Sequence, residues 1–584
     1  MHQKNGGILA KKYRQYLIPS ILTSLALALN EFVDCMLVSN LLDSDALAIA
    51  NLGCPVILII ASCYVLLGSG GATLYAIYLG KWEKKKAGKV FSVSMMLALI
   101  LGLAILLICT LLKNPITSVL CVDRALRPAF TSYYQILLFT APVLVLMLTF
   151  LCYLPPSGAP VIATTVNIVA NGMNLLMDIV YIRVFGMGVE GAAWATITGY
   201  LIGAVVMAVL IKKKNVEIVR HRIRAGDFYL VPMICTQGAA TAFLQICYAI
   251  KYAFSNNIAA VEGGRVGVVA FSLCLQSFSI ASVFLLGVAD AAQPFLAMLS
   301  GQKDYKGERA VLVRSFRLQL LFAVALIALF LLFPQGMTLL YGLDDPETVL
   351  MGMRGIRLFC LTYLTRGIAI QFMRFFQVEQ RKGYAFFISM MDGLFVIPIG
   401  FLLSRSIGLD GVFIAYPISA ALMLLIIMVI NTGIYLKHRG EYTGVMLVRK
   451  DTGDTAVLNL SITDDDVQIS AASEEMIEFC GEHGIAYKIA MKVGLMCEEM
   501  AVYTHHHRKE RGDIDFLLRI KKDSITMNFR SIGEPFDPTS QAEDDMAENF
   551  IMLNSLPHNL SYDYIMGMNN TQITMESQIP STKA

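Results

Sequence analysis

The sequence predicts an all-α protein that crosses a membrane many times, followed by a small soluble α/β domain. Of the 584 residues 56% are hydrophobic, and mean hydropathy is +0.61. Only 16% are charged, against about 25% in soluble domains. A bilayer core of about 30 Å needs about 20 apolar residues per helix. Twelve stretches meet that length, and we expect one transmembrane helix in each: 16–37, 50–78, 91–112, 131–153, 160–182, 190–211, 229–251, 267–299, 311–333, 351–376, 386–404 and 412–436.

The membrane part contains an internal repeat. Gly80 and Gly301 each close an apolar stretch and are followed by a short run of basic residues. Gly-Val-Glu-Gly at 188–191 recurs as Gly-Leu-Asp-Gly at 408–411, at nearly the same separation. We therefore predict two six-helix halves, 1–211 and 229–439, joined by a basic linker at 212–228. Repeated bundles of this kind are common in secondary transporters, whose sites lie near the bilayer midplane.

The charges in the loops predict the orientation. Basic residues fill alternate connections, including 81–89 and 212–224, and by the positive-inside rule this places both termini in the cytoplasm of a multi-pass cell-membrane protein. A net charge of +3 is too small to indicate nucleic acid. The twelve cysteines are scattered singly, and no cluster has metal-ligand spacing, so we expect free thiols and no metal. We also expect a monomer.

Charged groups inside the first six spans are candidates for chemistry, because a lone charge at the bilayer centre is costly. They are Glu31, Asp34 and Asp178. Asn174 precedes Asp178 by four residues and shares its helix face, and Thr196 lies on the next span. A carboxylate from the first helix facing this pair could hold a proton or Na⁺. The alternative is that Asp34 and Asp178 lie near helix ends and are hydrated.

The second half offers mainly neutral polar groups, so we expect ion chemistry in the first half and an apolar wall rich in Met and aromatic residues in the second. Arg366 is its notable charge. The residues predicted to line a substrate cavity are Glu31, Gln237, Gln245, Gln276 and Arg366.

Residues 10–440 resemble the multidrug and toxic compound extrusion family. The resemblance rests on Pro19, Asp34, Ala46-Leu47-Ala48, Pro55, Gly80, Asn174, Asp178, Gly188, Gly191-Ala192-Ala193, Thr196, Gln293-Pro294 and Gly301. It implies a twelve-helix antiporter that exports amphipathic, often cationic compounds against H⁺ or Na⁺, with no other cofactor. It also implies that Asp34, Asn174, Asp178 and Thr196 match the coupling residues of the DinF-like branch. Pro155-Pro156 replaces an Arg that the family often has before the fifth helix.

Residues 450–584 predict a separate cytoplasmic domain. We expect a strand at 455–462, helices at 473–481 and 488–503, and a hairpin of 513–520 with 525–530. Glu498-Glu499 and Gly533-Glu534-Pro535 resemble the GHKL ATPase fold of anti-sigma-factor kinases. In that fold an Asn four residues after the Glu holds Mg²⁺, and an Asp two residues before the Gly binds adenine. The resemblance aligns Glu499 and Gly533 with that Glu and Gly, so Tyr503 and Ser531 replace the two binding side chains. The domain is therefore expected to be a pseudo-ATPase.

Three functions remain open from the sequence. The first is an ion-coupled exporter of drug-like molecules with an accessory domain. That domain would contact basic cytoplasmic loops through its acidic stretches at 464–466 and 543–545, or would contact a cytoplasmic regulatory protein. The second is a lipid-linked-oligosaccharide flippase, which basic residues in the central cavity would favour. The third is a membrane sensor signalling through the ATPase-like domain. No phosphate-binding GxxxxGK[ST] loop occurs, which excludes the ATP-driven exporters that carry one.

Overall fold

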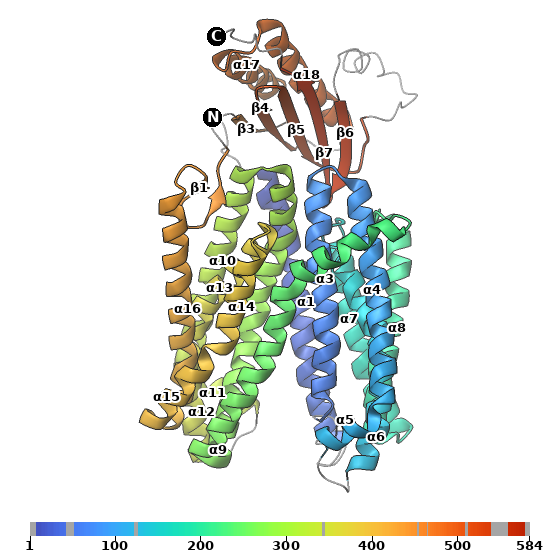
Figure 1. The fold of residues 1–584 in the computed structure, drawn as a ribbon, viewed down its shortest axis with the longest axis vertical. Helices are drawn as coiled ribbons and strands as arrows, with labels where there is room; N and C mark the ends of the chain where they lie inside the picture. Colours follow the sequence, from blue (N-terminus) through green and yellow to red (C-terminus); the bar gives the residue numbers. More distant parts are fainter. Residues whose placement is uncertain are drawn as a thin grey trace.

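The computed structural model describes residues 7–41, 49, 52–121, 126–341, 345–451, 455–463, 465–507, 512–538 and 559–577. A tall helical bundle forms most of the molecule, and the C-terminal α/β domain is stacked on one end of it (Figure 1). That end is called the domain side below.

The first half of the bundle contains a helix at every predicted span. Long apolar runs form α1 (Gly7–Leu41), α3 (Cys54–Gly80), α4 (Lys84–Leu111), α6 (Arg127–Leu151), α7 (Pro160–Asp178) and α8 (Gly188–Lys213). The short helix α5 (Lys113–Leu120) joins α4 to α6, and a π-helical segment, η1 (Ile179–Val184), continues α7.

The second half is more broken than predicted. After η2 (Ala225–Tyr229), α9 (Leu230–Gln302) covers two predicted spans and bends at Gly264, whose φ of 54° and ψ of −139° are not helical. The predicted spans 351–376 and 386–404 are each divided, the first between α12 (Pro346–Phe359) and α13 (Thr362–Val378), and the second between α14 (Lys382–Leu394) and α15 (Val396–Ile407). The remaining helices are α10 (Tyr305–Leu332), α11 (Gln335–Leu340) and α16 (Leu409–Lys437). Within the described ranges, nine helices are long and apolar enough to cross a membrane.

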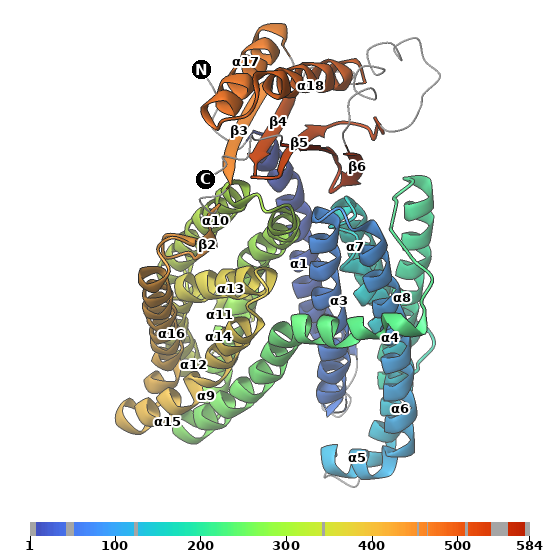
Figure 2. The same ribbon diagram turned by 45° about the horizontal axis from the view of Figure 1, so that its top comes forward.

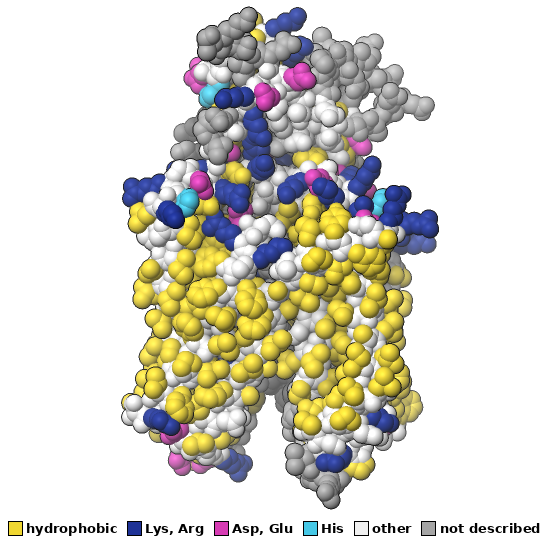
Figure 3. All heavy atoms as spheres, viewed as in Figure 1, with side chains coloured by type: hydrophobic (Ala, Val, Ile, Leu, Met, Phe, Trp, Pro, Cys, Tyr) yellow, Lys and Arg dark blue, Asp and Glu magenta, His cyan; other side chains and the backbone are white. Residues whose placement is uncertain are grey.

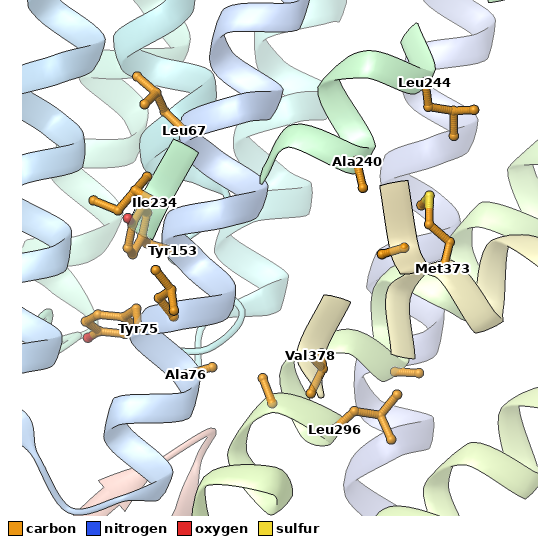
Figure 4. Close-up of a cluster of buried hydrophobic side chains, with 14 of the residues drawn as sticks. Leu67, Tyr75, Ala76, Tyr153, Ile234, Ala240, Leu244, Leu296, Met373 and Val378 are labelled. Atoms are coloured by element: carbon orange, nitrogen blue, oxygen red, sulfur yellow. The ribbon is translucent and has the colours of Figure 1, made fainter. Parts of the chain in front are cut away.

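The two halves meet along α3 and α9 on the domain side. A Cβ atom on Gly301 would lie 3.0 Å from the Gly80 Cα, so the two repeated glycines face each other directly. A Cβ on Gly70 would lie 2.6 Å from the Gly238 nitrogen. Glycine at these positions lets the helix backbones approach closely, as in other membrane bundles. Around them lies the buried apolar cluster drawn in Figure 4, to which both halves contribute.

At the opposite end the halves separate. Toward the end far from the domain, α9 lies in one lobe and α3 in the other (Figure 1), and the space-filling view shows a hollow between the two lobes there (Figure 3). The lobes are covered by exposed apolar side chains, and basic residues gather at the level of the domain side. The bundle is therefore closed on the domain side and open on the other.

The C-terminal domain is a five-stranded antiparallel sheet with two helices on one face (Figure 2). The strand order is β3 (Ala456–Thr463), β4 (Asp513–Ile520), β5 (Ser524–Ile532), β7 (Met568–Glu576) and β6 (Asn559–Ile565). The helices are α17 (Asp466–Glu482) and α18 (Tyr487–His506). The predicted strand, helices and hairpin are confirmed. The strands β6 and β7 were not predicted, because they contain many polar residues.

A short hairpin of β1 (Tyr442–Thr443) and β2 (Val448–Arg449) connects α16 to the domain.

Candidate functional site

A polar stripe runs along α7 in the first half. Asn167, Asn171, Asn174 and Asp178 recur every three or four residues, which places them on one helix face. Their exposed fractions are 7%, 4%, 4% and 0%. The sequence had singled out only the last two. The alternative of a hydrated Asp178 at a helix end does not fit its side chain, which is fully buried.

Two predicted coupling residues contact each other across α7 and α8. The Asn174 amide Nδ2 donates to the Thr196 Oγ1 over 3.4 Å, and that hydroxyl donates to the Ala192 carbonyl over 3.1 Å. The approach is possible because Gly199 has no side chain: a Cβ there would lie 2.8 Å from the Asn174 nitrogen. Asp178 follows one helical turn after Asn174 on the same face.

The backbone changes geometry at Asp178. This residue ends α7, and η1 begins at the next position. π-helical segments within α-helices are rare and occur often at functional sites, because the wider turn redirects side chains. The buried carboxylate therefore lies at a local irregularity rather than in a uniform helix.

The helix α1 packs beside α7, as the predicted site requires. The Thr164 hydroxyl on α7 donates to the Pro19 carbonyl on α1 over 2.8 Å and lies 2.9 Å from the Thr23 hydroxyl. The side chains of Glu31 and Asp34, further along α1, lie outside the described residues. Their roles stay predictions.

The second half contains a buried charge cluster, where the sequence predicted an apolar wall with Arg366 as its notable charge. Lys251, Arg366 and Asp392 have side chains that are 2%, 1% and 9% exposed. The Arg366 Nε lies 3.5 Å from the Asp392 Oδ1, and the Lys251 Nζ lies 4.0 Å from its Oδ2. The Lys251 ammonium also donates to the Asp392 carbonyl over 3.0 Å, and the Tyr248 hydroxyl donates to Oδ2 over 2.9 Å. We refer to these four residues as the Lys251 cluster.

Sequence reasoning missed Lys251 because it placed the end of the span at 251. The helix continues to the bend at Gly264, so Lys251 lies within it. The Gly-Gly pair at 263–264 was the available signal for the true end. The close packing of α14 on α9 completes the cluster, since a Cβ on Gly393 would lie 2.9 Å from the Cys247 sulfur.

The described residues that are predicted to line a substrate cavity differ in exposure, and their role stays a prediction. Gln237 is 1% exposed and exchanges two hydrogen bonds of 2.5 Å with Gln377. Gln276 is exposed, Gln245 is half-buried, and Arg366 is enclosed between the Tyr248 and Phe278 rings.

A polar contact that the sequence did not predict joins the halves instead. Arg374 on α13 pairs with Asp290 over 2.9 Å and donates to the Ser69 hydroxyl on α3 over 3.1 Å. Gln293 donates to Thr73 on α3 over 2.7 Å. Arg374 lies in the same predicted span as Arg366 and was overlooked.

The positions that resemble a nucleotide site are occupied by aromatic packing. The Tyr503 ring lies 4.1 Å from the His507 ring and 5.6 Å from the Phe536 ring. Ser531 is 3% exposed within β5, and the Gly533 carbonyl accepts from the Tyr564 hydroxyl over 3.1 Å. Glu499 is half-buried, and burial raises the pKa of its carboxyl. In the part of the chain that the structure describes, no group of three His, Cys, Asp or Glu side chains could hold a metal ion.

The C-terminal domain contacts the second half through two arginines. Arg530 pairs with Asp304 over 2.7 Å and donates to the Gln302 side chain over 2.5 Å. Arg519 donates to the carbonyls of Gln302 and Lys303 over 3.3 and 2.7 Å. The side chains of Arg530 and Asp304 are both only 5% exposed.

The same domain also contacts the first half. Asp563 on β6 forms an ion pair with Lys84 at the start of α4, and the Asp563 side chain is 3% exposed. The turn between β6 and β7 packs against the loop before α7, where a Cβ on Gly158 would lie 2.7 Å from the Gly567 nitrogen. Met566 and Met568 are buried in the same apolar cluster as residues of both halves. The domain thus bridges the two halves on their closed side.

This contact involves the predicted basic loop 81–89, but its charges on the second half differ from the predicted ones. On the second half the domain supplies the basic residues Arg519 and Arg530, and the loop of the bundle supplies the carboxylate of Asp304. The prediction had acidic residues on the domain and basic residues on the loops. Lys84 lies within the predicted basic loop 81–89, but its partner is Asp563. The predicted acidic stretches at 464–466 and 543–545 lie largely outside the described residues.

Comparisons with known proteins agree with this architecture. A sequence profile described as MatE matches residues 19–180 and 240–402. The multidrug export protein MepA of Staphylococcus haemolyticus is 21% identical over 404 residues, which cover 69% of this chain and 88% of that protein. MepA of Staphylococcus aureus strain MSSA476 is 20% identical over 421 residues, covering 72% and 93%.

Solved structures match the same region. An outward-facing conformation of a multidrug resistance MATE family transporter of the MOP superfamily has a TM-score of 0.68 at 21% identity, covering 73% of this chain and 96% of that one. A mutant of the Vibrio cholerae MATE transporter VcmN has a TM-score of 0.67 at 18% identity, covering 75% and 98%. At these identities the likeness concerns the fold.

Proposed function

Because the chain belongs to the MatE family of multi-pass helical membrane proteins, whose members are secondary transporters and not enzymes, we propose that it exports drug-like molecules across the cell membrane by antiport against H⁺ or Na⁺. We expect the exported molecules to be amphipathic and cationic. The observation that carries the antiport is the fully buried Asp178, at the start of a π-helical segment and one turn from the Asn174–Thr196 contact.

The chemistry of this group suits a coupling ion. A buried carboxylate beside amide and hydroxyl oxygens can bind Na⁺ through hard oxygen ligands, or a proton, because burial favours the neutral acid. Either ion would remove the charge that makes the buried carboxylate costly. Asp34 is proposed as the second carboxylate, contributed by the helix that packs on α7. Ion binding from outside and release inside would then alternate with substrate export.

The proposed topology has twelve membrane spans. Each half of α9 forms one span, the pair α12–α13 forms another, and the pair α14–α15 forms another, as the sequence predicts. The halves are 1–211 and 229–439, the linker is 212–228, and the soluble domain is 450–584. The domain side is assigned to the cytoplasm on the basis of its basic loops. The open side of the bundle then faces outward.

The accessory domain is proposed to act by contact. Export requires the bundle to open on the cytoplasmic side, and the domain holds both halves there through Arg530–Asp304 and Asp563–Lys84. The domain is proposed to favour the outward-open state until one of these two attachments is released. It would do so without ATP turnover, since Tyr503 and Ser531 replace the metal-binding and adenine-binding side chains. A cytoplasmic regulatory protein that takes over one attachment would have the same effect.

Transport by the purified full chain in vesicles tests the coupling. Ethidium serves as an amphipathic cationic probe, with a pH gradient or a Na⁺ gradient imposed separately. Asp178→Asn should abolish gradient-driven movement, whereas Asp410→Asn, at a partly exposed ion pair with Arg354, should not. Full gradient-driven activity in the Asp178→Asn protein contradicts the assignment. Movement of a lipid-linked oligosaccharide but not of ethidium favours the flippase.

Cross-linking tests the bridging role. Paired cysteines in place of Lys84 and Asp563 attach the domain to the first half, and those in place of Gln302 and Asn570 attach it to the second. Either cross-link alone should leave transport possible after oxidation, but both together should stop it until a reductant is added. Undiminished transport with both cross-links formed, verified by peptide mass spectrometry, contradicts the role.

A further inference from the structure

The charges of the Lys251 cluster do not balance. Two cations, Lys251 and Arg366, are buried within the second half. Asp392 is the only carboxylate in the described part of the chain that forms an ion pair with either. With all three groups ionised, the site carries one surplus positive charge inside a membrane-spanning bundle, where uncompensated charge is costly.

Among the residues that the structure describes, the surroundings of Lys251 and Arg366 do not supply a second anion. The Lys251 Nζ lies 4.3 Å from the centre of the Tyr248 ring, and the Arg366 guanidinium lies 4.0 Å from that of Phe278. Aromatic faces attract cations but do not neutralise them. The titratable or charged groups that face Lys251 are Cys247, Tyr248 and Tyr252 on α9, Arg366 on α13, Asp392 on α14 and Tyr416 on α16.

One of the three ionised groups can become neutral by proton transfer more readily than the other two. An arginine guanidinium keeps its proton in proteins. Asp392 is held as an anion by both cations and by the hydrogen bond from Tyr248. A buried lysine loses its proton much more easily than an exposed one. The surplus charge is therefore the proton on the Lys251 nitrogen.

The cluster also provides a connection away from the buried lysine. The Asp392 Oδ2 lies 4.0 Å from the Lys251 Nζ and accepts from the Tyr248 hydroxyl over 2.9 Å. Tyr248 is half-buried, whereas Lys251 is almost fully enclosed. Through Asp392, the buried amine therefore neighbours a side chain that is partly exposed.

We propose that Lys251 is a second proton-exchanging residue of the transport cycle, in the half that lacks the predicted coupling residues. The proposal rests on the proposed antiport and names the proton as an ion that it moves. In the exchange the Lys251 ammonium releases one proton to water and becomes a neutral amine, and the reverse step returns the proton to the nitrogen lone pair. When the proton is released, the net charge of the cluster changes from +1 to zero.

Counting protons in vesicles tests this role. The purified full chain is reconstituted with a trapped pH indicator, and the number of protons exchanged per ethidium is measured for the wild type, Lys251→Met and Lys251→Arg. Each variant fixes one charge state, so each should exchange one proton fewer per ethidium and show a flatter dependence of rate on pH. Lys306→Met, at an exposed lysine of α10, serves as the control and should match the wild type.

Thermal stability separates this role from a purely structural one. Lys251→Met removes the surplus charge and should melt no lower than the wild type at neutral pH, whereas a lysine needed only as an ion-pair partner would lower the melting temperature. An unchanged proton count in both variants overturns the inference, and so does a lowered melting temperature of Lys251→Met. If Lys251→Met does not fold, Lys251→Arg keeps the ion pair and decides the proton count. If the wild-type chain itself exchanges no protons, H⁺ antiport is contradicted together with the role of Lys251. If the wild type exchanges protons and both variants exchange the same number, only the role of Lys251 is contradicted.

Discussion

Replacing Asp392 by Asn would leave two buried cations without a counter-ion. Asp392 is 9% exposed on its side chain, and both Lys251 and Arg366 depend on it. Breaking a buried ion pair by removing one partner costs about 3–5 kcal/mol, because the remaining charge is uncompensated. For a folding unit of 150–250 residues, each kcal/mol lowers the melting temperature by about 2–4 °C. We therefore expect Asp392→Asn to lower the melting temperature of the second half by roughly 6–20 °C.

A second substitution should reverse part of this loss. Lys251→Met in the Asp392→Asn background removes one of the two uncompensated charges and fills the space with an apolar side chain of similar length. The melting temperature of the double variant should lie above that of Asp392→Asn alone. Such a recovery is the signature of coupled neighbouring residues in a double-mutant cycle.

Native cysteines provide the assay. Cys247, Cys274 and Cys360 are buried in the second half, near the cluster. A thiol-reactive dye that fluoresces on coupling reports their exposure as the detergent-solubilised chain is heated. Asp290→Asn, at a carboxylate that is 44% exposed, is the matched control and should shift the transition little. Equal melting of Asp392→Asn and wild type, or an additive double variant, would refute the charge-balance reasoning.

Three further predictions concern other parts of the molecule. Burial raises the pKa of Asp515 to about 6, so the folded domain binds this proton more tightly than the unfolded chain, and the resulting stability is present at low pH and lost as the pH rises through 6. The domain of the full chain should therefore be more stable to denaturant at pH 5 than at pH 7.5, by about 1.4 kcal/mol for the one pKa unit between pH 5 and 6. Asp515→Asn should remove that difference, and a pH dependence retained in the variant would rule it out. Gly301→Val should separate α3 from α9 and abolish transport, whereas Gly433→Val on α16, where a Cβ meets open space, should not; equal activity of the two proteins would disprove the close contact. Calorimetric titration of the full chain with Mg-ATP should give no heat of binding, and micromolar affinity would overturn the pseudo-ATPase assignment.

Much of the local structure could be predicted because it depends on neighbours along the chain. Apolar runs of sufficient length form helices in a bilayer whatever their partners, so every predicted span falls mainly on helix in the described ranges. The predicted hairpin of β4 and β5 depends on alternation and a polar turn, which are also local. The shared face of Asn174 and Asp178 follows from helix periodicity alone.

The internal repeat identifies equivalent positions in the two halves. The chain shows Gly80 and Gly301 as equivalent positions, but not that they touch. Their contact follows from the way the two halves pack around α3 and α9, where two backbones approach only if both residues lack a side chain. A pattern of equivalent residues becomes an interface only through that packing.

The charge pairings, by contrast, were decided only by the tertiary structure. Lys251 meets Asp392, Arg374 meets Ser69, and Arg530 meets Asp304 across long separations in the chain. The sequence determined which helices form and which residues share a face, since hydropathy and periodicity act over a few turns. It did not determine which buried charge faces which, because that depends on the bend at Gly264, the approach at Gly393 and the docking of the C-terminal domain. Coulomb energy depends on distance in space, and that distance exists only once the helices are packed.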